Sequence, residues 1–566
     1  MARPEKVRLG EILVQQKLLS EEQLGLALAD QKRSGRKLGR VFVGNGFVTE
    51  EQISGALARQ LGIAYINLKF YNTNPAVVRL LPETQARRFR ALLLEDHADS
   101  VLVGMSDPTD LFAYDEIARL VKKSVELAVV NETEVLHAID RIYRRTGEIT
   151  GLAREVEQDL GEVVDFGSMS ATPGLEEAPI VKLLQSVFDD ATQVRASDIH
   201  IEPQETTLQI RFRIDGVLHL QTETDIKVAT PLALRLKLMA DLDISEKRLP
   251  QDGRFAVKVK QQRVDVRIST MPTQYGESVV MRLLTQGGAA LRLDAIGMQP
   301  ELVARLRSIV RRPNGLVLVT GPTGSGKTTT LYSALAELNS MEKKLITVED
   351  PVEYRLPGIN QVQVNDKIDL TFARVLRSAL RQDPDIVLVG EMRDQETAQI
   401  GLRAAMTGHL VLSTLHTNDA ASTPLRLMDM GVPRYMVGSA LQAVLAQRLV
   451  RVICESCVTG HATSAAERQW LRLELGDLAE RAPCHAGRGC SHCNGQGYRG
   501  RTGVYELLEM TASVAAAANH PDPAHFLHAA HAQMAGETLR RHAVALVVQG
   551  RTTVQEAMRI TNQLED

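Results

Sequence analysis

The segment GPTGSGKTTT at residues 321–330 constrains the fold of this chain more than any other. It follows the apolar run LVLV at 316–319 and precedes LYSALAEL, which has the pattern of a helix. The spacing matches G-x-x-x-x-G-K-[ST] in the strand, loop and helix context that this motif requires. Backbone N–H groups of such a loop and the helix N-terminus together form a site for a polyphosphate. The segment therefore predicts a nucleoside triphosphate site on an α/β sheet.

Within this loop, Lys327 is predicted to contact the β- and γ-phosphates of ATP, and the Thr328 hydroxyl is predicted to help hold Mg²⁺. A glycine-rich turn without chemistry is the plain alternative, and the agreement of lysine, threonine and flanking elements argues against it. The loop alone does not separate a kinase from a motor or a transporter. The predicted ATP-binding residues are Gly321, Pro322, Thr323, Gly324, Ser325, Gly326, Lys327, Thr328 and Thr329.

Further apolar strands end in polar side chains that suit the same site. KLITVEDPVEY contains Glu349, and DIVLVGEMRD contains Glu391. Carboxylates at the C-terminal ends of strands lie where open α/β sheets bind ligands. We expect Glu349 to act as the general base and Glu391 to lie on the metal side, with the reverse assignment left open. His416, after a third strand in STLHTN, is either an ordinary structural histidine or a sensor of the γ-phosphate.

Length and charge limit the class of protein. A chain of 566 residues exceeds what one core supports and predicts several domains. Lys plus Arg number 66 and Asp plus Glu 69, and aromatic residues are 4%, so we expect no nucleic-acid substrate. MARPEKVRLG lacks the apolar region of a signal peptide, and no run reaches the roughly 18 apolar residues of a membrane span. We therefore expect a cytoplasmic protein.

An internal repeat occupies the N-terminal 60 residues. RLGEILVQQKLLSEEQLGLALADQ at 8–31 aligns with KLGRVFVGNGFVTEEQISGALARQ at 37–60. Each copy has an L-G pair and an S/T-E-E-Q segment typical of a capped helix, which predicts a short helix, a turn and a longer helix. A duplicated helical module that packs on itself is the plain structural interpretation.

Four of the five cysteines form two C-x-x-C pairs. Cys454 with Cys457 and Cys490 with Cys493 are separated by 32 residues, and Cys484 is left over. Two such pairs predict a tetrathiolate Zn²⁺ site, which is structural because four protein ligands close the coordination shell. Four thiols without a metal are the alternative.

The motifs GPTGSGKT, TVEDPVEY, LVGEMRD and STLHTN occur in an order that resembles the Walker A, Asp box, Walker B and His box of the secretion and pilus assembly ATPase family. This resemblance implies a homohexameric ring in which a sheet domain closes over ATP on a RecA-like domain. It also implies that the cysteine module contacts an inner-membrane platform protein, which recruits the chain to the membrane face. Arginines that match phosphate-facing positions of the family are Arg267, Arg282, Arg377 and Arg381, the last two expected on one helix face.

The duplicated unit resembles the MshEN-type, cyclic-di-GMP-binding domain found in some of these ATPases. Lys17 stands where the pattern has Gly, and Lys37 stands where it has Arg. The positions that the resemblance assigns to cyclic-di-GMP are Arg8, Leu9, Gly10, Leu13, Leu24, Leu28 and Gln31 in the first copy and Lys37, Leu38, Gly39, Gly46, Ile53, Leu57 and Gln60 in the second.

These features together predict an α/β multidomain protein. The expected parts are an N-terminal regulatory MshEN-type domain at 1–146, an acidic flexible linker at 147–178, a PAS-like α+β sheet domain at 179–290, and a RecA-like P-loop ATPase domain at 291–566 that includes the zinc module at 450–500. The expected function is ATP hydrolysis for assembly of a type IV pilus similar to the mannose-sensitive haemagglutinin pilus, under cyclic-di-GMP control. A type II secretion ATPase is the close alternative. A nucleic-acid translocase or a non-catalytic nucleotide-binding scaffold is less well supported.

Overall fold

The computed structural model describes residues 9–34, 38–143, 179–259, 262–285 and 292–561. It divides into two compact units, one of residues 1–151, 454–458 and 487–497, and the other of residues 152–453, 459–486 and 498–566. The predicted linker at 147–178 lies outside the described residues, as do Arg8 and Lys37. No helix within the described ranges is both long and apolar enough to cross a membrane.

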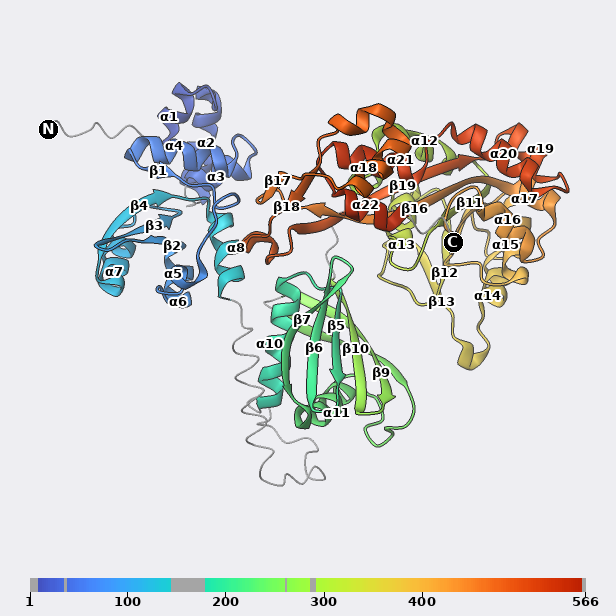
Figure 1. Ribbon diagram of the computed structural model, residues 1–566, viewed down its shortest axis with the longest axis horizontal. Helices are drawn as coiled ribbons and strands as arrows, with labels where there is room; N and C mark the ends of the chain where they lie inside the picture. The colour runs from blue at the N-terminus through green and yellow to red at the C-terminus, as the bar shows by residue number, and fades with distance from the viewer. Residues whose placement is uncertain (1–8, 35–37, 144–178, 260–261, 286–291, 562–566) are drawn as a thin grey trace. The chain divides into compact units, whose positions relative to one another are not determined.

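The internal repeat folds into four helices at the start of the chain, two from each copy (Figure 1). Thr49 caps the second long helix in a reciprocal arrangement with Gln52, and Ser20 makes the same pair of hydrogen bonds with Gln23, at 2.9 and 3.1 Å. The predicted helix, turn and helix of each copy are therefore confirmed. The elements are α1 (Leu9–Gln15), α2 (Glu21–Ser34), α3 (Leu38–Gly44) and α4 (Glu50–Leu61).

The turns inside the two copies have the same backbone conformation although their residues differ. Lys17 has φ of 58°, and Gly46, its counterpart in the second copy, has φ of 69°. Glycine adopts this left-handed region without a steric cost, whereas a residue with a Cβ does so at a cost of about 1 kcal/mol. The repeat geometry is thus maintained at Lys17 against the preference of that side chain.

A small α+β layer follows the repeat. Its sheet has the strand order β1-β4-β3-β2, with β1, β4 and β3 parallel and β2 antiparallel to β3. The elements are β1 (Ala64–Tyr65), α5 (Pro75–Val78), α6 (Glu83–Phe89), β2 (Ala91–Asp96), β3 (Ser100–Met105), α7 (Leu111–Val121), β4 (Ser124–Val129) and α8 (Glu132–Ile142).

Six antiparallel strands in the order β7-β6-β5-β10-β9-β8 form the sheet domain of the second unit. Buried and partly exposed residues alternate along β6, as the sequence TLQIRFRI predicts for a strand with one covered face. Helices α10 and α11 lie beside this sheet (Figure 1). The elements are α10 (Pro179–Gln193), β5 (Asp198–Pro203), β6 (Thr207–Ile214), β7 (Val217–Asp225), α11 (Ala229–Met239), β8 (Gln251–Val259), β9 (Gln262–Thr273) and β10 (Gly276–Thr285).

A seven-stranded sheet in the order β13-β12-β14-β15-β11-β16-β19 forms the centre of the ATPase domain. All neighbouring pairs are parallel except β16 with β19. The elements up to the last of these strands are α12 (Pro300–Val310), β11 (Gly315–Thr320), α13 (Lys327–Leu338), β12 (Leu345–Glu349), β13 (Asn360–Gln363), α14 (Phe372–Ala379), β14 (Ile386–Val389), α15 (Gln395–Met406), β15 (Leu410–Leu415), α16 (Thr423–Asp429), α17 (Arg434–Ala440), β16 (Leu441–Ile453), β17 (Val458–Gly460), α18 (Ala465–Leu475), β18 (His485–Gly487) and β19 (Tyr498–Glu509).

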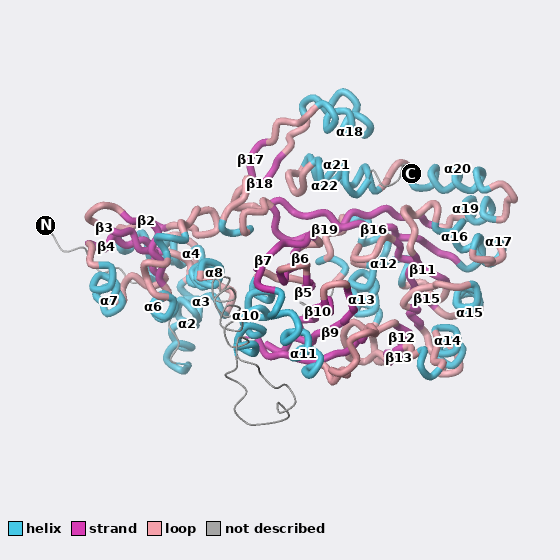
Figure 2. Tube along the Cα trace, turned by 60° about the horizontal axis from the view of Figure 1, so that its bottom comes forward, coloured by secondary structure: helices cyan, strands magenta, loops and turns pink. Residues whose placement is uncertain are grey.

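Helices cover both faces of this sheet (Figure 2). Leu316 and Leu318 of β11 belong to the core on the side of α15 and α17, whereas Val317 and Val319 belong to the core on the side of α12 and α13. Both sets are buried, which explains the continuous apolar run in this parallel strand. The α/β multidomain fold with a P-loop core is thereby confirmed. The chain ends with α19 (Ala512–Ala518), α20 (Pro523–Met534), α21 (Leu539–Val548) and α22 (Val554–Thr561).

Candidate nucleotide site and metal centre

The predicted phosphate loop connects β11 to α13. Gly321, Gly324 and Gly326 have φ of 142°, 79° and 88°, so the loop uses backbone conformations that favour glycine. Helix α13 begins at Lys327, which places the N–H groups of its first turn and the positive end of its dipole at the loop. The nine residues predicted to bind ATP therefore lie in one loop and one helical turn.

The Lys327 ammonium is held against this loop. Its Nζ donates to the carbonyl oxygens of Gly321 at 2.8 Å and Pro322 at 3.1 Å, and the residue is 9% exposed. The pKa of Lys327 is lowered to about 8, chiefly by burial; the charge of Glu391 opposes this shift, and the positive charge of Arg448 adds to it. If a bound phosphate replaced the two carbonyl oxygens as the partner of this amine, its negative charge would raise the pKa of Lys327 and keep the amine protonated.

Three neighbouring strands deliver the other predicted polar groups to one edge of the sheet. Glu349 ends β12, Glu391 follows β14, and His416 follows β15. Because these strands run parallel to β11 in the same sheet, with β15 directly beside it, their carboxyl ends and the phosphate loop share that edge.

The carboxylate of Glu349 is occupied by interior partners. It accepts hydrogen bonds from the hydroxyls of Tyr332 and Thr347 and from the Nε2 of Gln361, the last at 3.2 Å. Glu349 is 4% exposed, and burial followed by the Glu349 contact raises the pKa of Tyr332, so this phenol stays a donor. Sequence reasoning missed this cluster, because Tyr332 lies on α13 in a stretch whose pattern is only that of a helix.

Glu391 contacts a different set of groups. Its side chain is 17% exposed, its Oε1 pairs with Arg393, and its Oε2 lies 3.5 Å from the Nε2 of His416. Its charge also acts on Lys327. Glu391, His416 and Lys327 are thus brought into one electrostatic group, while Glu349 accepts hydrogen bonds from the interior. Arg393 was not foreseen from the sequence, although it stands only two residues after Glu391.

Threonine hydroxyls connect the loop of His416 to the strand before the phosphate loop. The hydroxyls of Thr320 and Thr417 lie 2.6 Å apart, and the Thr417 N–H donates to Thr320 at 3.0 Å. A second hydroxyl contact of 2.6 Å continues from Thr417 to Thr423. His416 itself is about half exposed, and burial followed by repulsion from Lys327 lowers its pKa.

The four predicted phosphate-facing arginines contact other parts of the protein in this structure. Arg267 donates to the Val352 carbonyl at 2.5 Å and pairs with Glu353 at 3.0 Å. Arg282 pairs with Asp198 at 3.1 Å. Their role at a bound phosphate stays a prediction.

Arg377 and Arg381 differ from the expected arrangement on one helix face. Helix α14 ends at Ala379, so Arg381 follows the helix and donates to the Arg377 carbonyl at 2.9 Å. Arg377, in the last turn, pairs with Glu396 at the start of α15. The expectation of a single helix face was wrong for Arg381, because the chain turns before the helix completes another turn.

The four paired cysteines converge in the first unit. The Sγ atoms of Cys454, Cys457, Cys490 and Cys493 all lie within 4.8 Å of one another, with Cys454 to Cys490 at 3.9 Å and Cys457 to Cys493 at 3.8 Å. Four Zn–S bonds of about 2.3 Å in a tetrahedron place the sulfurs about 3.8 Å apart. Cys484 is buried outside this group.

The surroundings of the sulfurs also fit a metal. Backbone N–H groups of Cys490 and Gly497 donate to the Cys493 Sγ at 3.3 and 3.2 Å, which suits a thiolate. Burial raises the pKa of Cys457 to about 12, so a cation is needed to keep that sulfur ionised at neutral pH. The cluster is therefore compatible with Zn²⁺.

Many of the residues that the resemblance assigns to cyclic-di-GMP binding pack in or against the core of the helical repeat. Leu13 is fully buried, Leu24, Leu38 and Ile53 pack around the same core, and Leu28 is exposed. A Cβ on Gly10 would lie 2.6 Å from Leu24, and one on Gly39 would lie 3.7 Å from Ile53, so each L-G pair packs on the long helix of its own copy. Leu57, Gln31 and Gln60 are partly exposed.

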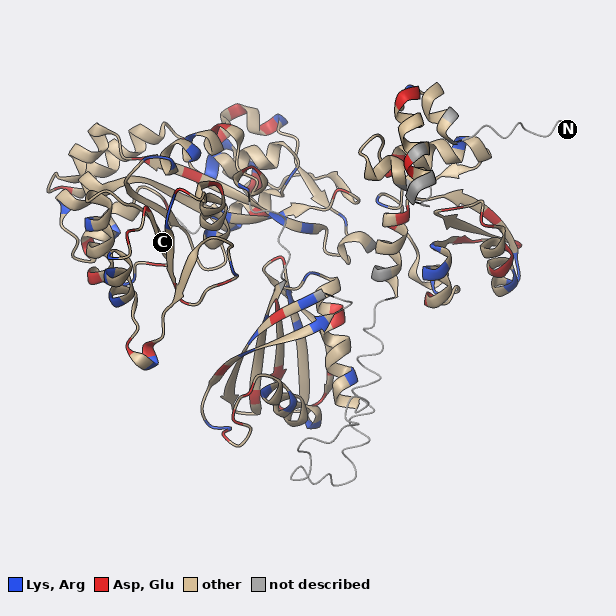
Figure 3. Cartoon of the chain, turned by 180° about the vertical axis from the view of Figure 1, so that it is seen from behind, with Lys and Arg blue, Asp and Glu red and all other residues tan. Residues whose placement is uncertain are grey.

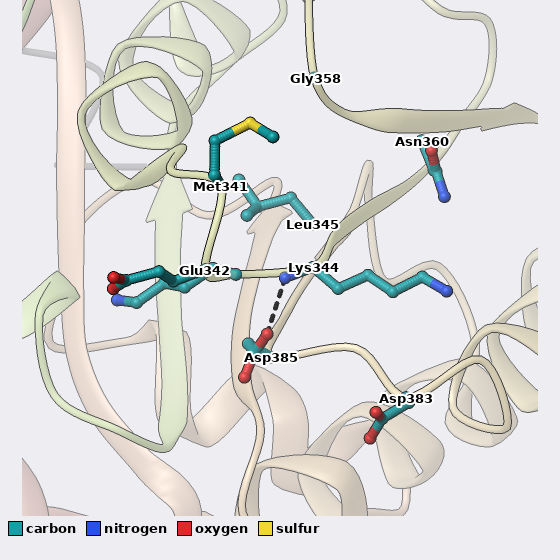
Figure 4. A pocket seen from close by; sticks show the side chains of 9 residues that line it. Met341, Glu342, Lys344, Leu345, Gly358, Asn360, Asp383 and Asp385 are labelled. Carbon is teal, nitrogen blue, oxygen red and sulfur yellow. Dashed lines mark hydrogen bonds between the residues drawn. The ribbon is translucent and has the colours of Figure 1, made fainter.

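A separate cavity of about 360 Å³ lies at the opposite edge of the sheet (Figure 4). It is lined by Lys344, Leu345 and Asp385, among others, where β12 and β14 begin, and the Lys344 N–H donates to Asp385 at 2.7 Å. The phosphate loop lies at the carboxyl ends of these strands, so this open cavity is not the nucleotide site.

Comparisons with known proteins agree with the fold and the motifs. The family model described as "Type II/IV secretion system protein" matches residues 174–559, and the model of the MshEN domain matches residues 61–149, which follow the helical repeat. The type IV pilus assembly ATPase PilB of Myxococcus xanthus is 40% identical over 565 residues, covering 97% of this chain and 98% of that protein. The type II secretion system protein E of Dickeya dadantii is 43% identical over 501 residues, covering 86% and 98%.

A likeness to a solved structure supports the fold alone. The ATPase DotB of Legionella pneumophila is 20% identical, with a TM-score of 0.51, over 68% of this chain and 96% of that chain. The family model covers most of this chain, and the pilus relative matches it almost from end to end. The chain therefore belongs to the type II/IV secretion system protein family, the family of pilus assembly and type II secretion ATPases.

Proposed function

We propose that this chain hydrolyses ATP with Mg²⁺ and uses the energy to assemble a type IV pilus. The observation that carries the hydrolysis is the meeting of the phosphate loop, Lys327, Glu391 and His416 at the carboxyl edge of one sheet. Lys327 binds the β- and γ-phosphates, and the N–H groups of the loop surround them. Mg²⁺, held with the help of Thr328, neutralises developing charge on the phosphates.

Glu391 is the carboxylate that this geometry favours for orienting the attacking water. It is partly exposed and shares its surroundings with His416 and Lys327, whereas Glu349 is buried beneath hydrogen-bond donors. This proposal reverses the expected roles of the two carboxylates. Glu349 then fixes the end of β12 and the position of α13 through Tyr332.

ATP turnover tests the proposed hydrolysis. We expect Lys327→Ala and Glu391→Gln to reduce turnover to background, because each removes a charged group from the phosphate site. Glu342→Gln and Lys343→Ala, two exposed residues at the other edge of the sheet, are the matched controls and should keep wild-type turnover. Robust turnover in Lys327→Ala or Glu391→Gln would place the active site elsewhere.

A pilus is favoured over a type II secretion system by the extent of the similarity. The pilus ATPase of Myxococcus xanthus aligns over 97% of this chain, whereas the type II secretion relative aligns over 86%. The pilus we propose is of the mannose-sensitive haemagglutinin type. A strain that lacks this chain should lose surface pili and still secrete its exoproteins, and Lys327→Ala should fail to restore the pili. Loss of secretion with intact pili would favour the type II alternative.

The proposed assembly is a homohexamer that acts in the cytoplasm at an inner-membrane platform protein. Lys and Arg are interspersed with Asp and Glu over the chain (Figure 3), which supports a protein partner over nucleic acid. Mass photometry with ATP should show a sixfold mass, and a protein that remains a monomer with every nucleotide would contradict the ring.

Cyclic-di-GMP is the proposed regulator. The duplicated helical unit and the adjacent MshEN match support a nucleotide-sensing N-terminal region. Calorimetry of the full chain should show cyclic-di-GMP binding that Arg8→Ala abolishes and that Arg59→Ala, outside the motif pattern, retains. Absence of heat with the wild-type chain would contradict this regulation.

A further inference from the structure

Strand β16 carries a buried amide that contacts the phosphate loop. Gln447 is 2% exposed, its Nε2 donates to the Ser325 carbonyl at 2.7 Å, and its Oε1 accepts from the Thr330 hydroxyl at 2.8 Å. Ser325 lies in the loop and Thr330 lies in the first turns of α13. The two contacts fix which end of the amide faces the loop, because only the NH₂ end can donate.

The same residue approaches both ends of the loop. A Cβ on Gly321 would lie 2.3 Å from the backbone carbonyl oxygen of Gln447, and a Cβ on Gly326 would lie 3.3 Å from its side-chain Nε2. The first of these contacts is too close for any residue except glycine. Strand β16 therefore packs against the loop where it leaves β11 and where it enters α13.

These contacts bear on how the loop presents its N–H groups. In a planar trans peptide the C=O and the following N–H point in opposite directions. Because the Ser325 carbonyl points at Gln447, the N–H of Gly326 points away from β16. A loop with three glycines at positive φ has many alternative conformations, so an external hydrogen bond is needed to hold one of them.

We infer that Gln447 is a positioning residue for nucleotide binding, which holds the phosphate loop in its phosphate-accepting conformation from a strand outside the known motifs. This inference rests on the ATP hydrolysis proposed above. Gln447 contacts the loop and Thr330, and it acts on the nucleotide only through them. Its loss should weaken the binding of substrate and transition state alike, which raises KM and leaves kcat nearly unchanged.

The test compares steady-state kinetics of matched variants. Gln447→Met keeps the side-chain length and removes both hydrogen bonds, and Gln447→Glu replaces the donor with an oxygen that faces the Ser325 carbonyl. We expect KM for ATP to rise about tenfold in Gln447→Met and further in Gln447→Glu, with kcat of Gln447→Met within about twofold of wild type. Gln442→Met makes the same change on the same strand beside Gly315 and Arg312, and should keep the wild-type KM.

Thr330→Val provides a second route if the Gln447 variants do not fold. It removes only the hydroxyl that orients the Gln447 amide, so KM should rise about threefold. In the Gln447→Met background, Thr330→Val should add nothing, because the group that it orients is gone. A folded Gln447→Met protein with wild-type KM, or an unchanged KM in Thr330→Val, would overturn the inference. Absence of turnover in the wild-type chain would instead refute the proposed hydrolysis.

Discussion

The Oε2 atom of Glu391 lies 3.5 Å from the Nε2 of His416 at the end of the neighbouring strand. Burial and the charge of Lys327 lower the pKa of His416, so this contact joins a carboxylate to a neutral imidazole at pH 7. A neutral imidazole has one N–H donor and one acceptor nitrogen, so it can donate a hydrogen bond to a phosphate oxygen without carrying a positive charge.

The titration of His416 follows from its neighbours. In the wild-type protein the histidine should titrate below about 6.5, its ordinary value. Lys327→Ala should move the midpoint upward because a repelling cation is removed, and Glu391→Gln should move it downward because an attracting anion is removed. NMR of ¹³C-labelled histidine measures both shifts, with the signal assigned by its absence in His416→Gln. Shifts of the opposite sign would show that Lys327 and Glu391 do not act on this ring.

Nucleotide affinity should fall with rising pH because of Lys327. Its pKa of about 8 in the nucleotide-free protein means that the amine loses its proton above pH 8, whereas bound phosphates favour the charged form. Binding at pH 9 then takes up a proton, and the dissociation constant rises by up to about tenfold per pH unit above 8. Calorimetry in buffers of different ionisation enthalpy detects the proton. Lys327→Arg, which stays charged, should lose this pH dependence.

Removal of the Tyr332 hydroxyl should lower the free energy of unfolding of the ATPase domain. Tyr332→Phe removes one of the buried donors to Glu349, at a cost of about 1–3 kcal/mol in the free energy of unfolding. Urea denaturation measures this change. Tyr354→Phe is the control, because Tyr354 packs edge to face on Tyr332 but is far more exposed. Full stability of Tyr332→Phe would contradict the structural role assigned to Glu349.

Metal content should depend on four cysteines and not on the fifth. The purified chain should contain about one Zn²⁺, and Cys457→Ser should lose most of it, because the remaining three sulfurs leave the tetrahedron open. Cys484→Ala alters a buried cysteine outside the cluster and should retain the metal. Elemental analysis of the purified variants decides between these outcomes.

Lys17→Gly should stabilise the helical repeat. The backbone at Lys17 is left-handed, as at Gly46, and glycine removes the steric cost of that conformation, worth about 1 kcal/mol. Thermal unfolding should shift upward in Lys17→Gly and downward in Lys69→Gly, because Lys69 has no positive φ to relieve and its ion pair with Glu455 is lost. A lower melting temperature in Lys17→Gly would show that the lysine side chain contributes more than its backbone costs.

The local sequence pattern was sufficient to predict the individual elements and motifs, but it was insufficient to predict which elements contact one another. The phosphate loop, the capped helices of the repeat and the two C-x-x-C pairs are each encoded within a few residues, and the structure places them as expected. Contacts between residues of different strands are not encoded in any short segment. Ser325 and Gln447 are 122 residues apart, and only the order of strands β11 and β16 brings them together.

The same reason explains why the sequence left the roles of the two carboxylates open. Glu349 and Glu391 both follow apolar strands, and nothing in those segments distinguishes a buried acceptor from a partly exposed one. The difference is set by Tyr332 from α13 and by His416 from the loop after β15. Likewise, the position of Arg381 depends on where α14 ends, which helical spacing does not specify.

The hydroxyls of Thr320, Thr417 and Thr423 lie within hydrogen-bond distance of one another in sequence, and each also has a backbone carbonyl partner, Leu415 for Thr320 and Asp419 for the other two. Thr320 ends β11, whereas Leu415 ends β15 and Thr417 follows it. Separation of these two strand ends would break the contacts of the Thr320 hydroxyl with the Leu415 carbonyl, the Thr417 hydroxyl and the Thr417 N–H. The segment that carries His416 is therefore tied by hydrogen bonds to the residue that immediately precedes the phosphate loop.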